Sequence, residues 1–146
     1  MLGGRRKARE IVFRVLYETE VTGEDLLEAL EFALGRYHLT EDGREHAIHL
    51  VRHLGERREE LDDRLRPRLA NWEIGRLSTV VRSILRLAMA ELSAAPDVPA
   101  RVILDQAVEL AKKYGEESAD AFVNGVLDPL ARAVRPGELD KRGNAS

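Results

Sequence analysis

Hydrophobic residues recur at three- and four-residue spacing along most of the chain, which is the period of an amphipathic helix. The clearest stripe runs from Leu77 to Leu92 and predicts a central core helix, with Arg82 and Arg86 on its opposite face. No stretch of useful length alternates with the period of two that strands require, and Leu and Ala outnumber the β-branched residues. The pattern therefore predicts an all-α protein.

Local signals predict where the other helices begin and end. A stripe of apolar residues predicts a first helix over residues 5–19, and Thr22 with the acidic residues after it is typical of a capping box that starts a second helix over about 24–37. Thr40 is expected to cap a third, longer helix that continues until Pro67 interrupts it. Pro99 restarts the chain, and Gly115 is expected to end the helix that follows.

The last predicted helix starts at Ser118, whose side chain is a suitable cap. Pro129 deprives the carbonyl of Gly125 of its partner, so we expect this helix to bend or break there. At 146 residues the chain has the length of one domain that can bury a substantial core. We expect a single helical domain over residues 1–136 and a flexible C-terminal tail over residues 137–146.

Composition narrows the class of protein. The chain has no cysteine, which excludes a disulfide scaffold, a thiolate metal site and a cysteine nucleophile, and is compatible with a reducing cytosol. It has no apolar run long enough to cross a membrane, and its first residues lack the apolar stretch of a secretory signal. We therefore expect a cytoplasmic protein with no membrane partner.

Charge is distributed unevenly along a chain whose net charge is only −3. The first fourteen residues carry five positive side chains against Glu10 alone, a local excess of +4, so the remainder carries −7. Helix N-termini attract anions, and four cations near this one add positive charge at the same place. These four are Arg5, Arg6, Lys7 and Arg9. From charge alone, an anion-binding arm and a basic solubilising tail remain equally open.

Candidate chemistry is sparse. His46, His49 and His53 share one face of the third predicted helix, and imidazole is a good zinc or nickel ligand. Three ligands on a single face rarely close a coordination shell, so partly exposed helical histidines are the preferred interpretation. The acidic residues Glu59, Glu60, Asp62 and Asp63 lie between Arg57 and Arg58 on one side and Arg64 on the other, which is typical of a salt-bridged solvent face. We find no catalytic or phosphate-loop motif and expect no enzyme activity, metal or cofactor.

Five motifs stand in order along the chain. They are the basic opening Arg5-Arg6-Lys7-Ala8-Arg9-Glu10 leading to Val15-Leu16-Tyr17, then Ile84-Leu85-Arg86-Leu87-Ala88 with Glu91-Leu92, then Asp97-Val98-Pro99, then residues 107–115 (AVELAKKYG), and finally residues 122–128 (FVNGVLD). Together, over almost all of Arg5 to Pro136, they resemble the NusB family of bacterial transcription antitermination factors. The sequence departs from the family pattern at Gln106, Ser118 and Ala121, where relatives can carry charged residues.

The resemblance implies an all-helical fold of two small bundles packed across one another, with about six to seven helices and no catalysis. It implies binding to the single-stranded boxA element of ribosomal RNA operon transcripts, together with the small-subunit ribosomal protein NusE. In that role the protein joins the elongating RNA polymerase and other Nus factors and promotes elongation past terminators.

The resemblance also assigns two groups of residues. Arg5, Arg6, Lys7 and Arg9 would form the RNA-binding arm. A second RNA or partner surface would include Tyr17, Lys112, Lys113, Tyr114 and Phe122. Aromatic rings that reach the surface can stack on unpaired bases, whereas the spacing of Phe122 also matches a buried stripe.

One alternative comes from another functional class. The chain would be a non-catalytic helical adaptor or a homodimer without specific RNA recognition. In that case the third helix and the face that carries Arg82 and Arg86 would bind proteins, and the basic opening would be only a tail.

Overall fold

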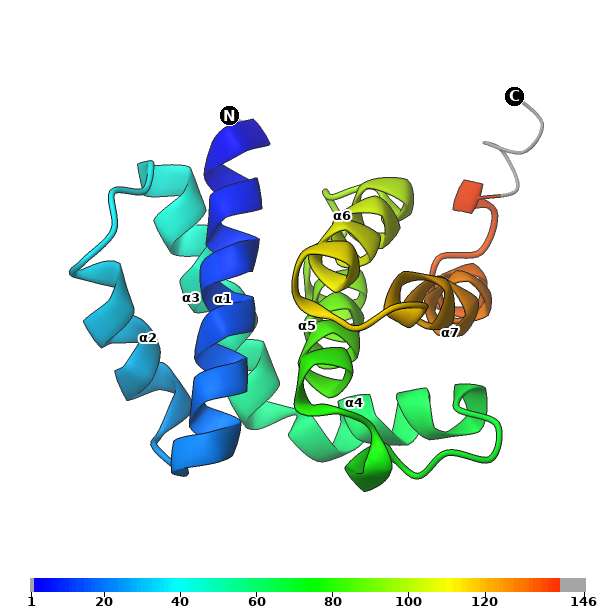
Figure 1. Cartoon of the computed structure of the whole chain (residues 1–146). Coiled ribbons are helices and arrows are strands. Elements are labelled where there is room, and N and C mark those ends of the chain that lie inside the picture. The colour runs from blue at the N-terminus through cyan, green and yellow to red at the C-terminus, as the bar shows by residue number, and fades with distance from the viewer. Residues whose placement is uncertain (1, 140–146) are drawn as a thin grey trace. The chain divides into compact units, whose positions relative to one another are not determined.

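The computed structural model describes residues 2–139, and within this range the chain forms seven α-helices, two short 3-10 helices and no strand. The all-α prediction is confirmed. The chain divides into two compact units, residues 1–58 and residues 59–146 (Figure 1). No helix in the described range is both long and apolar enough to cross a membrane.

The first unit consists of α1 (Leu2–Thr22), α2 (Leu26–Leu34) and α3 (Glu41–Glu56), which pack on one another (Figure 1). Thr40 caps α3 as predicted, because its hydroxyl accepts a hydrogen bond from the Gly43 amide at 3.0 Å. The cap of α2 differs from the prediction.

Asp25 caps α2 in place of Thr22, and its carboxylate accepts from the Glu28 amide at 3.0 Å. The Thr22 hydroxyl instead accepts a hydrogen bond from the Glu24 amide at 3.2 Å, before α2 begins. Gly23, with φ of +77°, turns the chain between the two helices and moves the start of α2 beyond the reach of Thr22.

The first turns of α1 and α3 approach each other at two glycines. A Cβ atom at Gly43 would lie 2.6 Å from the carbonyl oxygen of Gly4, and a Cβ atom at Gly4 would collide with the hydroxyl of Thr40. Both approaches are closer than real Cβ contacts, so glycine at position 43 lets the two backbones come this close, and glycine at position 4 leaves room for the Thr40 side chain.

The second unit contains α4 (Arg58–Leu65), α5 (Thr79–Ala94), α6 (Ala100–Tyr114) and α7 (Ala119–Val134), with 3-10 helices at Arg66–Arg68 and Ile74–Arg76. The last three α-helices pack on one another (Figure 1). The prediction of one long third helix up to Pro67 is wrong. The helix is interrupted at Arg57, whose φ of −125° and ψ of 26° are not helical, and the chain continues as α4.

The core helix α5 is capped by Ser78 and buried around its whole circumference from Ser83 to Leu92. Arg86 lies inside this segment and donates two hydrogen bonds to Asp62 of α4, at 3.0 and 2.9 Å. The two side chains are only 10% and 5% exposed. The predictions that Arg86 faces away from the core and that Asp62 belongs to a solvent face are therefore wrong.

The last helix runs through Pro129 without a break, so of the predicted bend or break the break does not occur. Pro129 and Gly125 are both exposed, so water can bond the carbonyl that proline leaves unpaired. Ser118 stands at the N-cap position but has a left-handed φ of 75°, and its hydroxyl makes no capping bond, so that cap was also predicted wrongly.

The chain after α7 folds back onto the second unit. Arg135 donates hydrogen bonds to the carbonyls of Leu92, Ala95 and Val98 at 2.8 to 3.0 Å. Glu138 accepts from the Ala100 amide at 2.8 Å and so caps α6, since Pro99 has no side-chain donor or acceptor to do this. Of the expected tail, residues 137–139 are thus packed, with Leu139 buried, and residues 140–146 lie outside the described range.

Candidate nucleic-acid interface

The basic cluster lies in the first turns of α1, a folded helix that packs on α2 and α3. Arg5 is engaged with Asp42 of α3 in a two-pronged ion pair, with nitrogen–oxygen distances of 2.8 and 3.1 Å. The hydrogen bond from Arg5 lowers the pKa of the Asp42 carboxyl below its ordinary value. Arg5 therefore holds the start of α1 against the start of α3, and the cluster is not a loose tail.

The other three members of the cluster have different surroundings. Arg6 is exposed, and Lys7 is exposed while its Nζ donates to the His38 carbonyl at 3.1 Å. Arg9 is only 5% exposed. The charges of Arg6 and Lys7 are therefore exposed to solvent, whereas the same role was predicted from the sequence for all four residues.

Tyr17 lies further along α1 and is 40% exposed, with its ring centroid 6.5 Å from that of Phe13. Ten residues separate it from Lys7, which is about 15 Å along a helix. A nucleic acid strand that follows α1 from the basic cluster can therefore meet an aromatic ring on the same helix.

The other members of the second predicted group lie in the second unit. Lys112 and Lys113 are exposed in the last turn of α6, where cations favour the helix dipole. The Lys113 ammonium lies 5.4 Å from the centroid of the Tyr114 ring. Tyr114 itself is half-buried.

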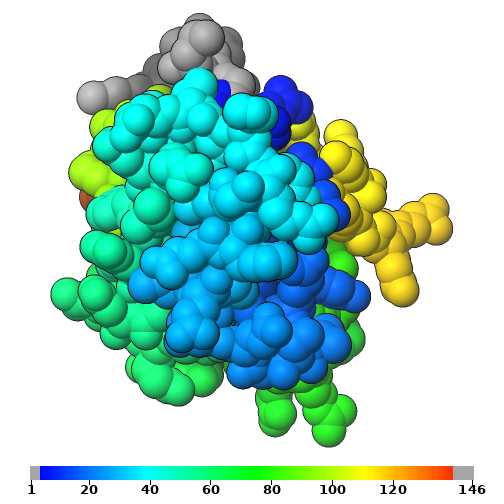
Figure 2. All heavy atoms as spheres, turned by 90° about the vertical axis from the view of Figure 1, so that its left-hand side faces the viewer, coloured from blue at the N-terminus to red at the C-terminus, as the bar shows by residue number. Residues whose placement is uncertain are grey.

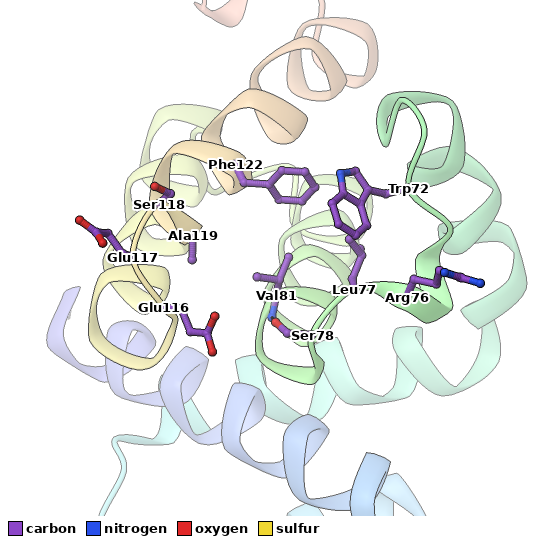
Figure 3. Close-up of a pocket in the computed structure, with 10 residues that line it drawn as sticks. All are labelled: Trp72, Arg76, Leu77, Ser78, Val81, Glu116, Glu117, Ser118, Ala119 and Phe122. Atoms are coloured by element: carbon purple, nitrogen blue, oxygen red, sulfur yellow. The ribbon is translucent and has the colours of Figure 1, made fainter.

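Phe122 lines a pocket of about 300 Å³ within the second unit. In Figure 3 its ring points toward the indole of Trp72, with Leu77 and Val81 of the 77–81 segment beside them. Phe122 is half-buried, and Trp72 is 55% exposed. Trp72 was not among the predicted site residues, although it is the only tryptophan of the chain and lies between the two 3-10 helices.

Acidic side chains also border this pocket. Glu116 and Glu117 are exposed and lie between α6 and α7 (Figure 3). Arg76 is also exposed and lines the pocket, so its rim carries charges of both signs. The aromatic walls suit a flat group such as a base.

The three histidines of α3 do not share one environment. His46 is 6% exposed, His53 is half-buried and His49 is exposed. Among residues 2–139, no three or more His, Asp or Glu side chains are grouped so that they could hold a metal ion.

The chain is similar to known proteins along most of its length. Residues 6–132 match the model of the NusB family. The transcription antitermination protein NusB of Pseudothermotoga lettingae is 42% identical over 136 residues, which are 92% of this chain and 95% of that protein.

Two solved structures are also similar. The NusB of T. maritima has a TM-score of 0.87 and 38% identity, with 94% of this chain and 96% of that chain covered. A chain of the crystal structure of the antitermination factors NusB and NusE in complex with dsRNA has a TM-score of 0.82 and 33% identity, with 91% and 99% covered. By sequence along most of its length and by fold, this chain belongs to the NusB family.

Proposed function

We propose that the protein is a transcription antitermination factor that binds boxA RNA of ribosomal RNA operon transcripts together with NusE. With NusE and other Nus factors it would join the elongating RNA polymerase and promote elongation past terminators. The observation that carries this proposal is the similarity over 91% of the chain to a structure whose protein is bound to NusE and RNA.

We also propose that the role is non-catalytic and cytoplasmic, with no cofactor. A factor that holds RNA and a ribosomal protein makes and breaks no covalent bond. The cysteine-free sequence fits a reducing compartment, which is where bacterial transcripts are made.

We propose different tasks for the four basic residues. Arg6 and Lys7, which are exposed, would neutralise phosphates directly. Arg5, bound to Asp42, and the buried Arg9 would fix the helix that carries those two residues. A few phosphate contacts give weak binding, so NusE would complete the surface.

Replacing Arg6 and Lys7 together by alanine is expected to weaken binding to boxA RNA and to a scrambled RNA alike. Each phosphate contact to a single strand contributes about −0.7 to the slope of log K against log salt, so the loss of two contacts should flatten the slope by about 1.4. Fluorescence anisotropy with labelled RNA over a salt series, with and without NusE, measures both effects.

A charge-matched control is Arg64→Ala with Arg68→Ala, since both residues are exposed and lie in the other unit. This control should leave the slope unchanged. An unchanged slope in the Arg6 and Lys7 variant would remove these residues from the RNA contact. Equal, weak binding of both RNAs to the wild-type protein with NusE present would favour the helical adaptor without specific RNA recognition.

The Trp72 and Phe122 pocket provides a second test, because Trp72 is the only tryptophan and its fluorescence reports on one place. We propose that an unpaired base stacks there, and expect boxA RNA to quench Trp72 more than scrambled RNA does. Phe122→Ala should reduce boxA affinity by about 1–3 kcal/mol, the value of one stacked base.

The matched control is Phe32→Ala, which removes a more exposed phenylalanine from the first unit. It should leave both the quenching and the boxA affinity unchanged. Identical quenching by the two RNAs would show that the pocket does not read a base.

A further inference from the structure

A second cavity, of about 520 Å³, lies in the first unit on the outer side of α2. Its walls come from the end of α1, the turn that follows, α2 and the residues after α2. We call it the α2 groove. It is lined chiefly by Glu18, Glu24, Asp25, Glu28, Phe32 and Tyr37. Figure 2 views the first unit from the side on which the blue atoms of α2 lie at the surface.

The α2 groove is acidic. Four of its lining residues carry carboxylates, and Arg36 is the only cationic side chain among its lining residues. Asp25 uses one carboxylate oxygen to cap α2, whereas Glu24 and Glu28 are exposed. The groove is therefore an electrostatic match for a cationic ligand.

Two aromatic side chains of the α2 groove are exposed to solvent. Phe32 is 70% exposed on a nine-residue helix, and Tyr37 is 38% exposed. The guanidinium carbon of Arg36 lies 5.8 Å from the centroid of the Phe32 ring, so this ring already accepts a guanidinium over one face. Carboxylates beside an exposed ring are the combination that binds arginine and lysine side chains.

The α2 groove lies apart from Arg6 and Lys7, the two exposed cations of the proposed RNA site. Glu18 lies twelve residues after Arg6 on α1, about 18 Å along the helix. That distance exceeds the screening length of about 8 Å at physiological ionic strength. RNA phosphates would be repelled by the four carboxylates, so the charge argues for a protein as the occupant.

We propose that the α2 groove is a docking site for a basic segment of a partner protein, one that presents arginine or lysine next to an apolar side chain. The cation would pair with Glu24 or Glu28 and stack on Phe32, while the apolar side chain would contact Tyr37. This surface is distinct from the exposed cations Arg6 and Lys7, and the docking proposal does not depend on the RNA contact.

The test uses the full chain and a synthetic probe, the acetylated and amidated pentapeptide Arg-Leu-Arg-Leu-Arg. The control peptide carries citrulline at each arginine, which keeps the shape and removes the charge. In ¹⁵N–¹H spectra we expect the arginine peptide to shift amides between residues 24 and 37, and the citrulline peptide to leave them in place.

Variants assign the contacts. Phe32→Ala should raise the Kd of the peptide about two- to fivefold, the value of one exposed cation–π contact. Glu28→Gln keeps the shape and the backbone bond to Asp25, and should have an effect of similar size. The matched control is Val21→Ala, because Val21 is 71% exposed and does not line the groove. It should leave the Kd unchanged.

Three results would overturn the proposal. They are the absence of shifts in α2 with the arginine peptide, equal shifts with the citrulline peptide, and an unchanged Kd in the Phe32 variant. Sedimentation that shows self-association abolished by Phe32→Ala would also overturn it, since the occupant would then be a second copy of this chain. Phe32→Ala and Glu28→Gln should keep the boxA affinity and salt slope of the wild type, so this test and the RNA test fail independently.

Discussion

Asp62→Ala is expected to lower the free energy of unfolding of the second unit by about 3–5 kcal/mol. The substitution removes the Asp62 carboxylate from the Arg86 guanidinium, which lies inside α5 and is only 10% exposed. Removing one member of a buried ion pair costs far more than the pair itself contributes. Urea unfolding followed by Trp72 fluorescence measures the effect, because Trp72 belongs to the same unit.

Two controls separate this cause from others. Asp63→Ala removes the neighbouring acid, which pairs with Arg66 at the surface, and should cost no more than about 1 kcal/mol. The double variant Asp62→Leu with Arg86→Met replaces the buried pair with apolar side chains and should recover most of the stability. A double variant as unstable as Asp62→Ala would contradict the explanation by an unpaired charge.

Arg135→Ala is expected to destabilise the second unit by at least about 3 kcal/mol. Three backbone carbonyls, at Leu92, Ala95 and Val98, would each lose a charged donor, and these three residues are buried. Such bonds contribute about 1.5–3 kcal/mol each, and neighbouring losses do not add fully. The same urea titration measures the loss.

Arg132→Ala is the matched control, since Arg132 lies on the same helix and pairs with Asp128 at 46% exposure. Its loss should cost about 0.5 kcal/mol or less. A loss for Arg135→Ala no larger than that of the control would mean that the backbone carbonyls find other donors.

The features of the fold that depend on local chemistry could be predicted from the sequence. The cap at Thr40, the core helix and the end of α6 at Gly115 follow from side chains within a few residues of one another. The pairing of Asp62 with Arg86 could not be predicted, because 24 residues separate the two and each looks like a solvated charge in its own helix. The continuity of α7 through Pro129 could not be predicted either, because it depends on the exposure of Pro129 in the folded chain.

The candidate site was predictable in the same uneven way. Composition located the basic cluster, but only packing distinguishes the exposed Arg6 from the buried Arg9. Trp72 comes to face Phe122 across fifty residues of chain, and no periodicity connects a loop residue with a helix that distant. Family resemblance transfers residue identities, whereas these differences in exposure belong to the folded chain.

The glycine contact between α1 and α3 bears on how genetic data for this protein are interpreted. Gly43 touches the backbone of Gly4, one residue before Arg5, so any side chain at position 43 displaces the turn that carries the basic cluster. A selection for lost RNA binding would recover substitutions at Gly43 alongside those at Arg6 and Lys7. Such alleles would act through the position of the helix that carries the proposed contacts, and should not be counted as contacts themselves.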